Sequence, residues 1–227
     1  MNNDIRHYQN EIYEQLARIG KAISSPRRLE LLELLSQGPR TVETIAEEAN
    51  LSVANASQHL KALRSARLVE SEKNGVYSTY RLASEEVLQF LATLKELAGK
   101  RVAEIDQLFH NYLETHGVLE SMTREELISR TKKGNVTVID VRPVEEYRAG
   151  HLPGAISVPL NELEANLSKL SKDHEIIAYC RGQYCILAAQ AVELLQRNGF
   201  KAYRFDESIQ DWEAHSLAVE KGEGRTE

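Results

Sequence analysis

Cysteine is scarce in this chain: 227 residues contain only two, Cys180 and Cys185, and both fall in one short segment. Neither has a distant partner with which it would cross-link the fold. The sequence therefore lacks the disulfide framework that small secreted proteins use. In a reducing compartment, two thiols this close together indicate reactive or metal-binding groups rather than a structural disulfide.

Long apolar runs are also absent. No stretch approaches the roughly 18 consecutive apolar residues that a membrane helix requires, and the polar start at residues 1–8 lacks the apolar centre of a signal peptide. We therefore expect a cytoplasmic protein without a membrane partner. A length of 227 residues favours two domains, each large enough to form its own core.

The chain has no overall excess of positive charge, since its formal net charge at pH 7 is -6. Between residues 51 and 82, however, five basic side chains stand against only two acidic ones, Glu70 and Glu72. The basic residues are Lys61, Arg64, Arg67, Lys73 and Arg81. A basic patch on an acidic protein is compatible with contact to DNA phosphates.

The first part of the chain shows the pattern of helices followed by a hairpin. Thr41 is placed to cap a short helix that ends at Ala49, and Ser52 is placed to cap a second helix over residues 53–66. The tight turn between them has helix-turn-helix spacing. Behind them, Asn74-Gly75 lies between two strand-like segments and is a strong hairpin signal. The pattern predicts a winged helix-turn-helix, mainly α with a β-hairpin wing.

A single long helical pattern continues from Ser84 to about Gly117, with an apolar stripe along it. The stripe consists of Val87, Leu91, Leu94, Ala98, Ile105, Leu108 and Tyr112. A helix of roughly 30 residues is on the order of 45 Å long, which is more than one small domain can cover. Because residues 12–19 also have an amphipathic pattern, we expect a homodimer formed through the long helix and the first one.

The second part of the chain alternates strands with helices, after a capping box at Thr123 and Glu126. The expected strands are 136–140, 156–158, 176–179 and 202–205, and the expected helices lie near 143–149, 161–170 and 186–198. Such alternation predicts an α/β domain with a parallel sheet and a site at the carboxyl ends of the strands. We place the domains at residues 1–117 and 118–227 and expect the tail at 220–227 to be frayed.

Cys180 lies where an apolar strand runs into a helix. The short loop after it allows backbone N-H groups to surround the sulfur, and the N-terminus of the following helix adds positive potential. This environment favours the thiolate, which is the reactive form of cysteine. The loop therefore predicts a nucleophile in an anion cradle.

Four segments together resemble the ArsR-type family of bacterial winged-helix repressors, over about residues 10–115. They are Arg27-Arg28-Leu29, the run from Thr44 to Glu48, the run from Leu51 to Leu63, and the wing from Gly75 to Leu82. The resemblance implies that the recognition helix enters the major groove of double-stranded operator DNA. The contacts it implies are Ser52, Asn55, Ser57, Gln58, His59 and Lys61 on that helix and Tyr77 and Arg81 on the wing.

Many ArsR-type proteins bind metals or arsenicals, through cysteines in the helix-turn-helix or through Asp and His residues on the last long helix. Residues 41–66 contain no cysteine. The long helix offers Asp106, His110, Glu114 and His116, but they do not reproduce the family's metal spacing. We therefore predict no metal and no cofactor, and a metal- or arsenical-responsive repressor stays an alternative.

The segment from Asp140 to Pro159, together with the cysteine loop, resembles rhodanese-like sulfurtransferases over about residues 121–219. The resemblance implies that Cys180 forms a persulfide and that Arg181 helps to hold an anionic donor. The implied sulfur cradle is the backbone of Arg181, Gly182, Gln183, Tyr184 and Cys185. By the same resemblance, Asp140 and Arg142 are expected mostly to brace the site and the fold. Glu146, Gly150, His151, Pro153 and Gly154 are architectural in the family, with His151 a buried hydrogen-bonding residue.

Loop length separates this pattern from its relatives. Phosphatases and arsenate reductases built on the same fold use a loop one residue longer that is closed by arginine, whereas the sixth residue after Cys180 is Ile186. Two departures from the rhodanese pattern stand out. Glu207-Ser208 replaces a Gly-Gly pair before Trp212, and Cys185 adds a second thiol. Cys185 either resolves a Cys180 persulfide or packs as a small buried residue.

The leading hypothesis is a dimeric transcriptional regulator whose rhodanese domain reacts with thiosulfate, a persulfide or a polysulfide and alters operator affinity. One alternative is a sulfurtransferase enzyme with an independent DNA-binding arm. Another is a rhodanese fold that serves as an inert binding module. Whether the chain is an enzyme stays open at this point.

Overall fold

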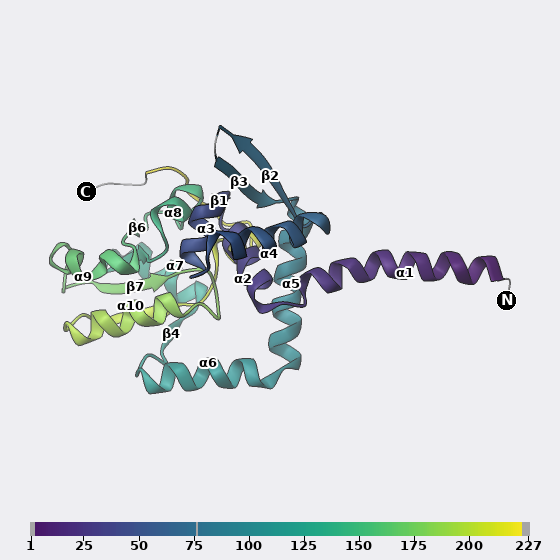
Figure 1. Cartoon of the computed structure of the whole chain (residues 1–227). Coiled ribbons are helices and arrows are strands. Elements are labelled where there is room, and N and C mark those ends of the chain that lie inside the picture. Colours follow the sequence, from purple (N-terminus) through teal and green to yellow (C-terminus); the bar gives the residue numbers. More distant parts are fainter. Residues whose placement is uncertain (1–2, 76, 224–227) are drawn as a thin grey trace. The chain divides into compact units, whose positions relative to one another are not determined.

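The computed structural model describes residues 3–75 and 77–223, and it divides into two compact units, residues 1–100 and 101–227 (Figure 1). The division falls ahead of the predicted boundary at residues 117 and 118. The difference arises because the helix at Ala103–Thr115 packs in the core of the second unit.

The first unit is a helical domain with a three-stranded sheet. Its elements are α1 Asn3–Ile23, α2 Pro26–Ser36, β1 Arg40–Thr41, α3 Val42–Glu48, α4 Val53–Ser65, β2 Val69–Asn74, β3 Tyr77–Leu82 and α5 Glu85–Arg101. The sheet has the order β1-β3-β2 and is antiparallel. The short strand β1 was not predicted, because two residues carry no periodic signal. The winged helix-turn-helix prediction is confirmed.

Local capping explains where the two central helices begin. The hydroxyl of Thr41 accepts from the N-H of Thr44, and the hydroxyl of Ser52 accepts from the N-H of Asn55. Both interactions satisfy a backbone donor that a helix leaves unpaired at its first turn. Asn50 takes a left-handed conformation, with φ 50°, and turns the chain between α3 and α4. The two caps fix where α3 and α4 begin, and Asn50 forms the tight turn between them that the sequence predicted.

The prediction of one continuous helix from Ser84 to Gly117 is wrong. The segment is two helices, α5 and α6 Ala103–Thr115, and Val102 between them has φ -111° and ψ 85°, outside the helical region. Gly99 and Val102 are both weaker helix formers than their neighbours, which lowers the cost of a break here. Leu113 is buried in the second unit's core, and Phe109 packs against it. Tyr112 also packs against this core, whereas Leu108 is exposed, so the apolar stripe of α6 is only partly covered within its own unit.

The second unit is an α/β domain built on a five-stranded parallel sheet of order β4-β8-β7-β5-β6. Its further elements are β4 Ser121–Met122, α7 Arg124–Lys133, β5 Val136–Asp140, α8 Val144–Ala149, β6 Ile156–Ser157, η1 Leu160–Glu162, α9 Leu163–Asn166, η2 Leu167–Lys169, β7 Glu175–Tyr179, α10 Ile186–Arg197, β8 Ala202–Phe205 and α11 Ile209–Ala214. The parallel-sheet prediction is confirmed, and the expected helix near 161–170 is divided into three short turns.

Strand β7 shows how alternation places the site. Ile176, Ala178 and Cys180 pack in one core cluster with α10, whereas Ile177 and Tyr179 pack in the cluster on the opposite face. Successive side chains of a strand point to opposite faces. Cys180 therefore emerges at the carboxyl end of the central strand, on the face that α10 and α6 cover.

The end of the chain is more ordered than expected, as far as residue 223. His151 and Glu220 pair as an antiparallel bridge through two backbone hydrogen bonds of 2.9 and 3.0 Å. The N-H of Gly222 donates to the carbonyl of Arg148 at 2.9 Å. The expectation of a frayed tail is therefore wrong for residues 220–223, and the remaining positions lie outside the described residues. No helix in the part of the chain that the structure describes is both long and apolar enough to span a membrane.

Candidate functional site

The cysteine loop occupies the six residues between β7 and α10. Cys180 follows the last residue of β7 and is 1% exposed, and Cys185 occupies the N-cap position of α10. The N-H of Cys185 donates to the carbonyl of Gly182 at 3.0 Å, which closes the loop into a turn. Gly182 has φ 111°, a conformation that side chains other than glycine rarely adopt. The loop thus has the strand, turn and helix order that the sequence predicted for the cradle.

The two cysteines lie within bridging distance of each other. Their Cα atoms are 6.4 Å apart and their sulfur atoms are joined as a disulfide. Cα separations below about 7 Å permit a bridge without backbone movement. The distance that the sequence could not supply is therefore short enough for Cys185 to react with a group on Cys180.

Arg181 is held by a buried carboxylate. Its Nη2 lies 2.5 Å from Oε1 of Glu146, and its Nε donates to Oε2 at 3.1 Å. The Glu146 side chain is completely buried, while that of Arg181 is 17% exposed. A bidentate pair of this kind fixes the guanidinium plane. Glu146 therefore has a positioning role toward the loop, in addition to the architectural one that the sequence implied.

Asp140 and Arg142 form a buried ion pair that Tyr179, the residue before Cys180, joins. Nε and Nη2 of Arg142 donate to the two carboxylate oxygens at 2.9 and 2.6 Å, and Nη2 also donates to the carbonyl of Gly150 at 2.7 Å. The hydroxyl of Tyr179 donates to Asp140 at 2.6 Å and accepts from the N-H of Leu152. Burial raises the pKa of Tyr179 well above its ordinary range, so the phenol remains a donor.

His151 is completely buried, in agreement with its expected structural role. Its Nδ1 lies 2.8 Å from the carbonyl oxygen of Tyr147, and the two rings stack with centroids 3.7 Å apart. The departure at Glu207-Ser208 also has a structural explanation. Ser208 caps α11 through Asp211, and Glu207 receives two hydrogen bonds of 2.7 Å from Arg124.

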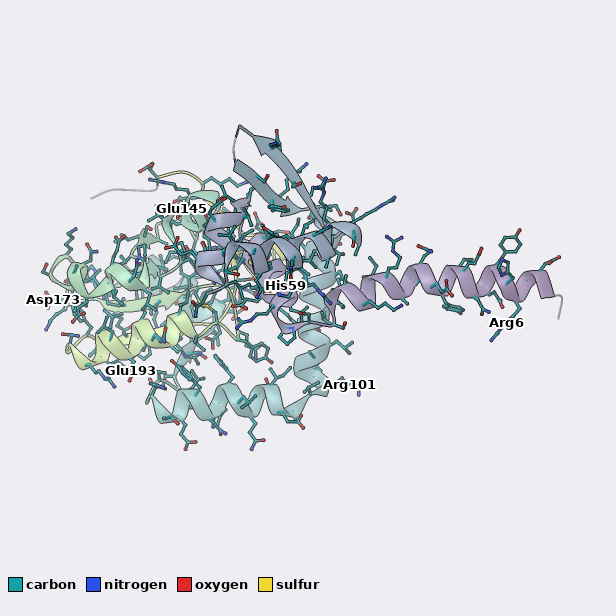
Figure 2. All side chains as sticks on the ribbon, in the orientation of Figure 1. Arg6, His59, Arg101, Glu145, Asp173 and Glu193 are labelled. Carbon is teal, nitrogen blue, oxygen red and sulfur yellow. A yellow bond between two sulfur atoms is a disulfide. The ribbon has the colours of Figure 1, made fainter. Side chains whose placement is uncertain are left out.

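The exposed face of α4 carries most of the predicted DNA contacts. Asn55, Gln58 and Lys61 follow one another at three-residue spacing and are exposed, which places them on one side of the helix. Ser57 and His59 are half-buried, and Figure 2 labels His59 on α4. Leu60 and Leu63 point into the core on the other side. The helix therefore presents a polar, partly basic face.

Three of the predicted contacts have other roles or cannot be placed. The hydroxyl of Ser52 caps α4, as described above. Arg81 on β3 is exposed and forms an ion pair of 2.7 Å with Glu70 on β2, which partly offsets the basic charge of the wing. The side chain of Tyr77 lies outside the described residues.

Two family models match the chain. The model of bacterial regulatory proteins of the arsR family matches residues 25–71, and that of the rhodanese-like domain matches residues 123–215. The HTH-type transcriptional regulator Rv0324 of Mycobacterium tuberculosis is 40% identical over 211 residues, which make up 93% of this chain and 92% of that protein. The chain belongs to the ArsR family of bacterial transcriptional regulators.

The regulator carries its rhodanese-like domain after the winged helix, as the sequence predicted. Shorter relatives match only part of this chain. The HTH-type transcriptional regulator YgaV of Escherichia coli is 35% identical over 37% of this chain and 86% of its own length. The solution structure of a homodimeric winged helix-turn-helix domain, Mb0332 from Mycobacterium bovis, is 39% identical, covers 41% of this chain and 86% of that one, and has a TM-score of 0.40.

Two of the four residues considered as metal ligands, Asp106 and His116, have other partners in the regulator. Asp106 accepts a hydrogen bond of 2.6 Å from Tyr184, and Nδ1 of His116 lies 2.9 Å from Oε2 of Glu193, a residue of α10 labelled in Figure 2. Across residues 3–75 and 77–223 the structure contains no group of three or more His, Cys, Asp or Glu side chains that would hold a metal ion.

Sequence reasoning missed the contacts that α6 makes with the cysteine loop. Tyr184 was interpreted only as part of the backbone cradle, and Asp106 only as a possible ligand. Their pairing joins residues 78 positions apart, and no local pattern in the sequence signals it.

Proposed function

We propose that this regulator accepts a sulfur atom at Cys180 from a small donor, and that the resulting change in the cysteine loop alters its affinity for operator DNA. The observation that supports the proposal is the cysteine pair, in which a buried Cys180 at the end of β7 lies within bridging distance of Cys185. Because the pair is in the same chain as a winged helix, a reaction at the cysteines can affect DNA binding.

The first step is transfer of the outer sulfur. The Cys180 thiolate attacks the outer sulfur of a persulfide donor, the sulfur-sulfur bond of the donor breaks, and the donor leaves as a thiolate. With thiosulfate the leaving group is sulfite. Cys180 then carries a persulfide, and no electron acceptor from outside is needed. The turn at Gly182 and the N-terminus of α10 favour the anionic outer sulfur.

The second step uses Cys185. Its thiolate attacks the Sγ atom of Cys180, the bond to the outer sulfur breaks, and that sulfur leaves with the electron pair as hydrosulfide. The two cysteine thiols are oxidised to a disulfide while the transferred sulfur is reduced. The short Cα separation makes this step intramolecular.

Replacing Cys185 with serine is expected to stop the second step and preserve the first. The variant should accumulate a Cys180 persulfide and release hydrosulfide roughly 100-fold more slowly, because the intramolecular attacking thiol is gone. Intact-mass measurement and a hydrosulfide assay after addition of polysulfide check this. Hydrosulfide release at the wild-type rate would identify Cys185 as a packing residue only.

A dimer is the second part of the proposal. Helix α1 exposes an apolar stripe in which Ile5, Tyr8, Ile12 and Leu16 are each more than half exposed. Figure 1 shows most of α1 extending away from the other helices of its unit. An unpaired stripe of this kind favours a second copy of the chain as its partner, and two recognition helices then read two half-sites.

Placing a charge in that stripe is expected to separate the dimer. Ile12→Glu should behave as a monomer in sedimentation, and its operator affinity should fall about 100-fold because the two half-sites are no longer bound together. Asn10→Glu puts the same charge on the opposite side of α1 and should remain dimeric. A dimeric Ile12→Glu protein would contradict the role of α1.

A second candidate is a sulfurtransferase enzyme with an independent DNA-binding arm. The separation of the chain into two units, each with its own core, favours it. Operator binding with and without polysulfide, measured at fixed salt beside transfer of sulfur from thiosulfate to cyanide, distinguishes the two. Brisk turnover with unchanged operator affinity would support the independent enzyme and contradict sensing.

A further inference from the structure

The cysteine loop holds one side chain that contacts a different helix. Tyr184, the residue before Cys185, donates a hydrogen bond of 2.6 Å from its hydroxyl to Oδ1 of Asp106. Its ring meets the ring of Phe109 edge-on, with centroids 5.6 Å apart. Both partners lie on α6, so the loop and this helix are joined by one polar and one aromatic contact.

The α6 side of this contact is held in place by other groups. The guanidinium of Arg204 lies 5.4 Å over the Phe109 ring, and Nε of Arg204 donates to the carbonyl of Val118 at 3.0 Å. Leu113 is buried one turn further along α6. Phe109 is thus held from β8, whereas Tyr184 is held through the cysteine loop.

The hydroxyl of Tyr184 stays protonated across the physiological pH range. The bond to Asp106 raises the pKa of Tyr184 to about 12, so the phenol stays protonated and remains a donor. Ionisation of Tyr184 therefore does not break the contact in this range.

Helix α6 is also the element that leads to the winged helix. It begins one residue after α5 ends, with Val102 between them. A change in how α6 is held therefore has the shortest covalent route to the first unit. The alternative is that Tyr184 has only a packing role at the edge of the core.

We propose that Tyr184 is a positioning residue that couples the oxidation state of the cysteine pair to α6. The contact belongs to the bridged state seen in the structure, in which the Cys180–Cys185 disulfide restricts the loop. In the dithiol state the loop has more conformations available, and the contact is made less often. The inference rests on the proposed function of the cysteine pair. It adds the contact through which the oxidation state of the pair affects α6.

Coupling of this kind is reciprocal. If the disulfide favours the contact between Tyr184 and Asp106, the contact must favour the disulfide by the same factor. Loss of the contact should therefore shift the thiol-disulfide equilibrium toward the dithiol. With dithiothreitol as reductant, two electrons and two protons pass to the bridge, and dithiothreitol becomes its own cyclic disulfide.

The test is the equilibrium constant for reduction of the bridge in dithiothreitol redox buffers, measured on the full chain. Tyr184→Phe and Asp106→Ala should each be reduced about fivefold more readily than wild type. The double variant should match either single variant, because both remove the same interaction. Tyr203→Phe on β8, paired with Ile177 in the middle of the sheet, and Asp173→Ala, ahead of β7, are the matched controls and should keep the wild-type constant.

A second readout reports on α6 itself. In wild type, backbone amides of residues 103–115 should exchange hydrogen more slowly in the disulfide state than in the dithiol state, and Tyr184→Phe should abolish that difference. Equal exchange in the two states of wild type, or an unchanged equilibrium constant in both single variants, would overturn the inference. A purely structural role would lower the melting temperature without changing either readout between states.

The two proposals fail separately. If polysulfide never modifies Cys180, the proposed function fails, whereas the redox-buffer measurement still decides whether Tyr184 reads the bridge. If wild type and Tyr184→Phe share one reduction constant while polysulfide still changes operator affinity, the sensing function holds and this route does not.

Discussion

A Cys180→Ser regulator is expected to transfer no sulfur from thiosulfate to cyanide above background, a loss of about 10³-fold or more. The same substitution should make operator affinity independent of polysulfide. Cys180 is the only thiol placed at the strand end with the loop turn and the N-terminus of α10 around it, and a serine hydroxyl forms no persulfide.

The Cys185→Ser variant serves as the matched control, because it removes the same chemical group five residues away. It should retain transfer to cyanide while losing the disulfide. Both activities are measured at one salt concentration, since contacts to DNA phosphates make affinity depend steeply on salt. Transfer by Cys180→Ser at a rate near wild type would place the nucleophile elsewhere and contradict the proposal.

Replacing Arg142 with alanine is expected to destabilise the second unit by about 3–5 kcal/mol, because it leaves a buried carboxylate without its partner. Arg142 and Asp140 are essentially inaccessible to solvent. Burial lowers the pKa of Arg142, but the hydrogen bonds and charge of Asp140 more than offset this and hold the pKa above its ordinary value. The guanidinium is therefore charged in the folded protein.

Urea unfolding followed by tryptophan fluorescence measures this loss selectively. Trp212 is the only tryptophan in the chain and is buried in the second unit, so its signal reports that unit. Arg148→Ala is the control, since the pair of Arg148 with Glu223 is exposed and contributes about 0–1 kcal/mol at most. Equal effects of the two substitutions would show that the buried pair is not the brace that its geometry indicates.

Much of the fold could be predicted because its signals are local. Thr41, Ser52 and Thr123 cap helices through residues three positions away. Strands β5 and β7 are each recognisable as a short apolar run. The position of Cys180 between a strand and a helix is likewise a local property. Confirmed features of this kind need no knowledge of distant residues.

The wrong prediction of one long helix over residues 84–117 shows the limit of local sequence patterns. The apolar positions of residues 84–117 are the same whether they face a second chain or the core of their own unit. Gly99 and Val102 weaken the helix only slightly, and helix propensity is routinely overridden by packing. The structure breaks the helix at Val102, and Leu113 of α6 lies in the core of the second unit.

The sequence by itself determined the two-domain order, the winged helix, the parallel sheet and the presence of two thiols in one loop, because each depends on residues close together in the chain. Only the tertiary structure decided which side chains from distant parts of the chain contact one another. The pairing of Arg181 with Glu146, the distance between the two cysteines, and the contact of Tyr184 with Asp106 are set by the packing of separate elements. Local periodicity carries no information about such contacts.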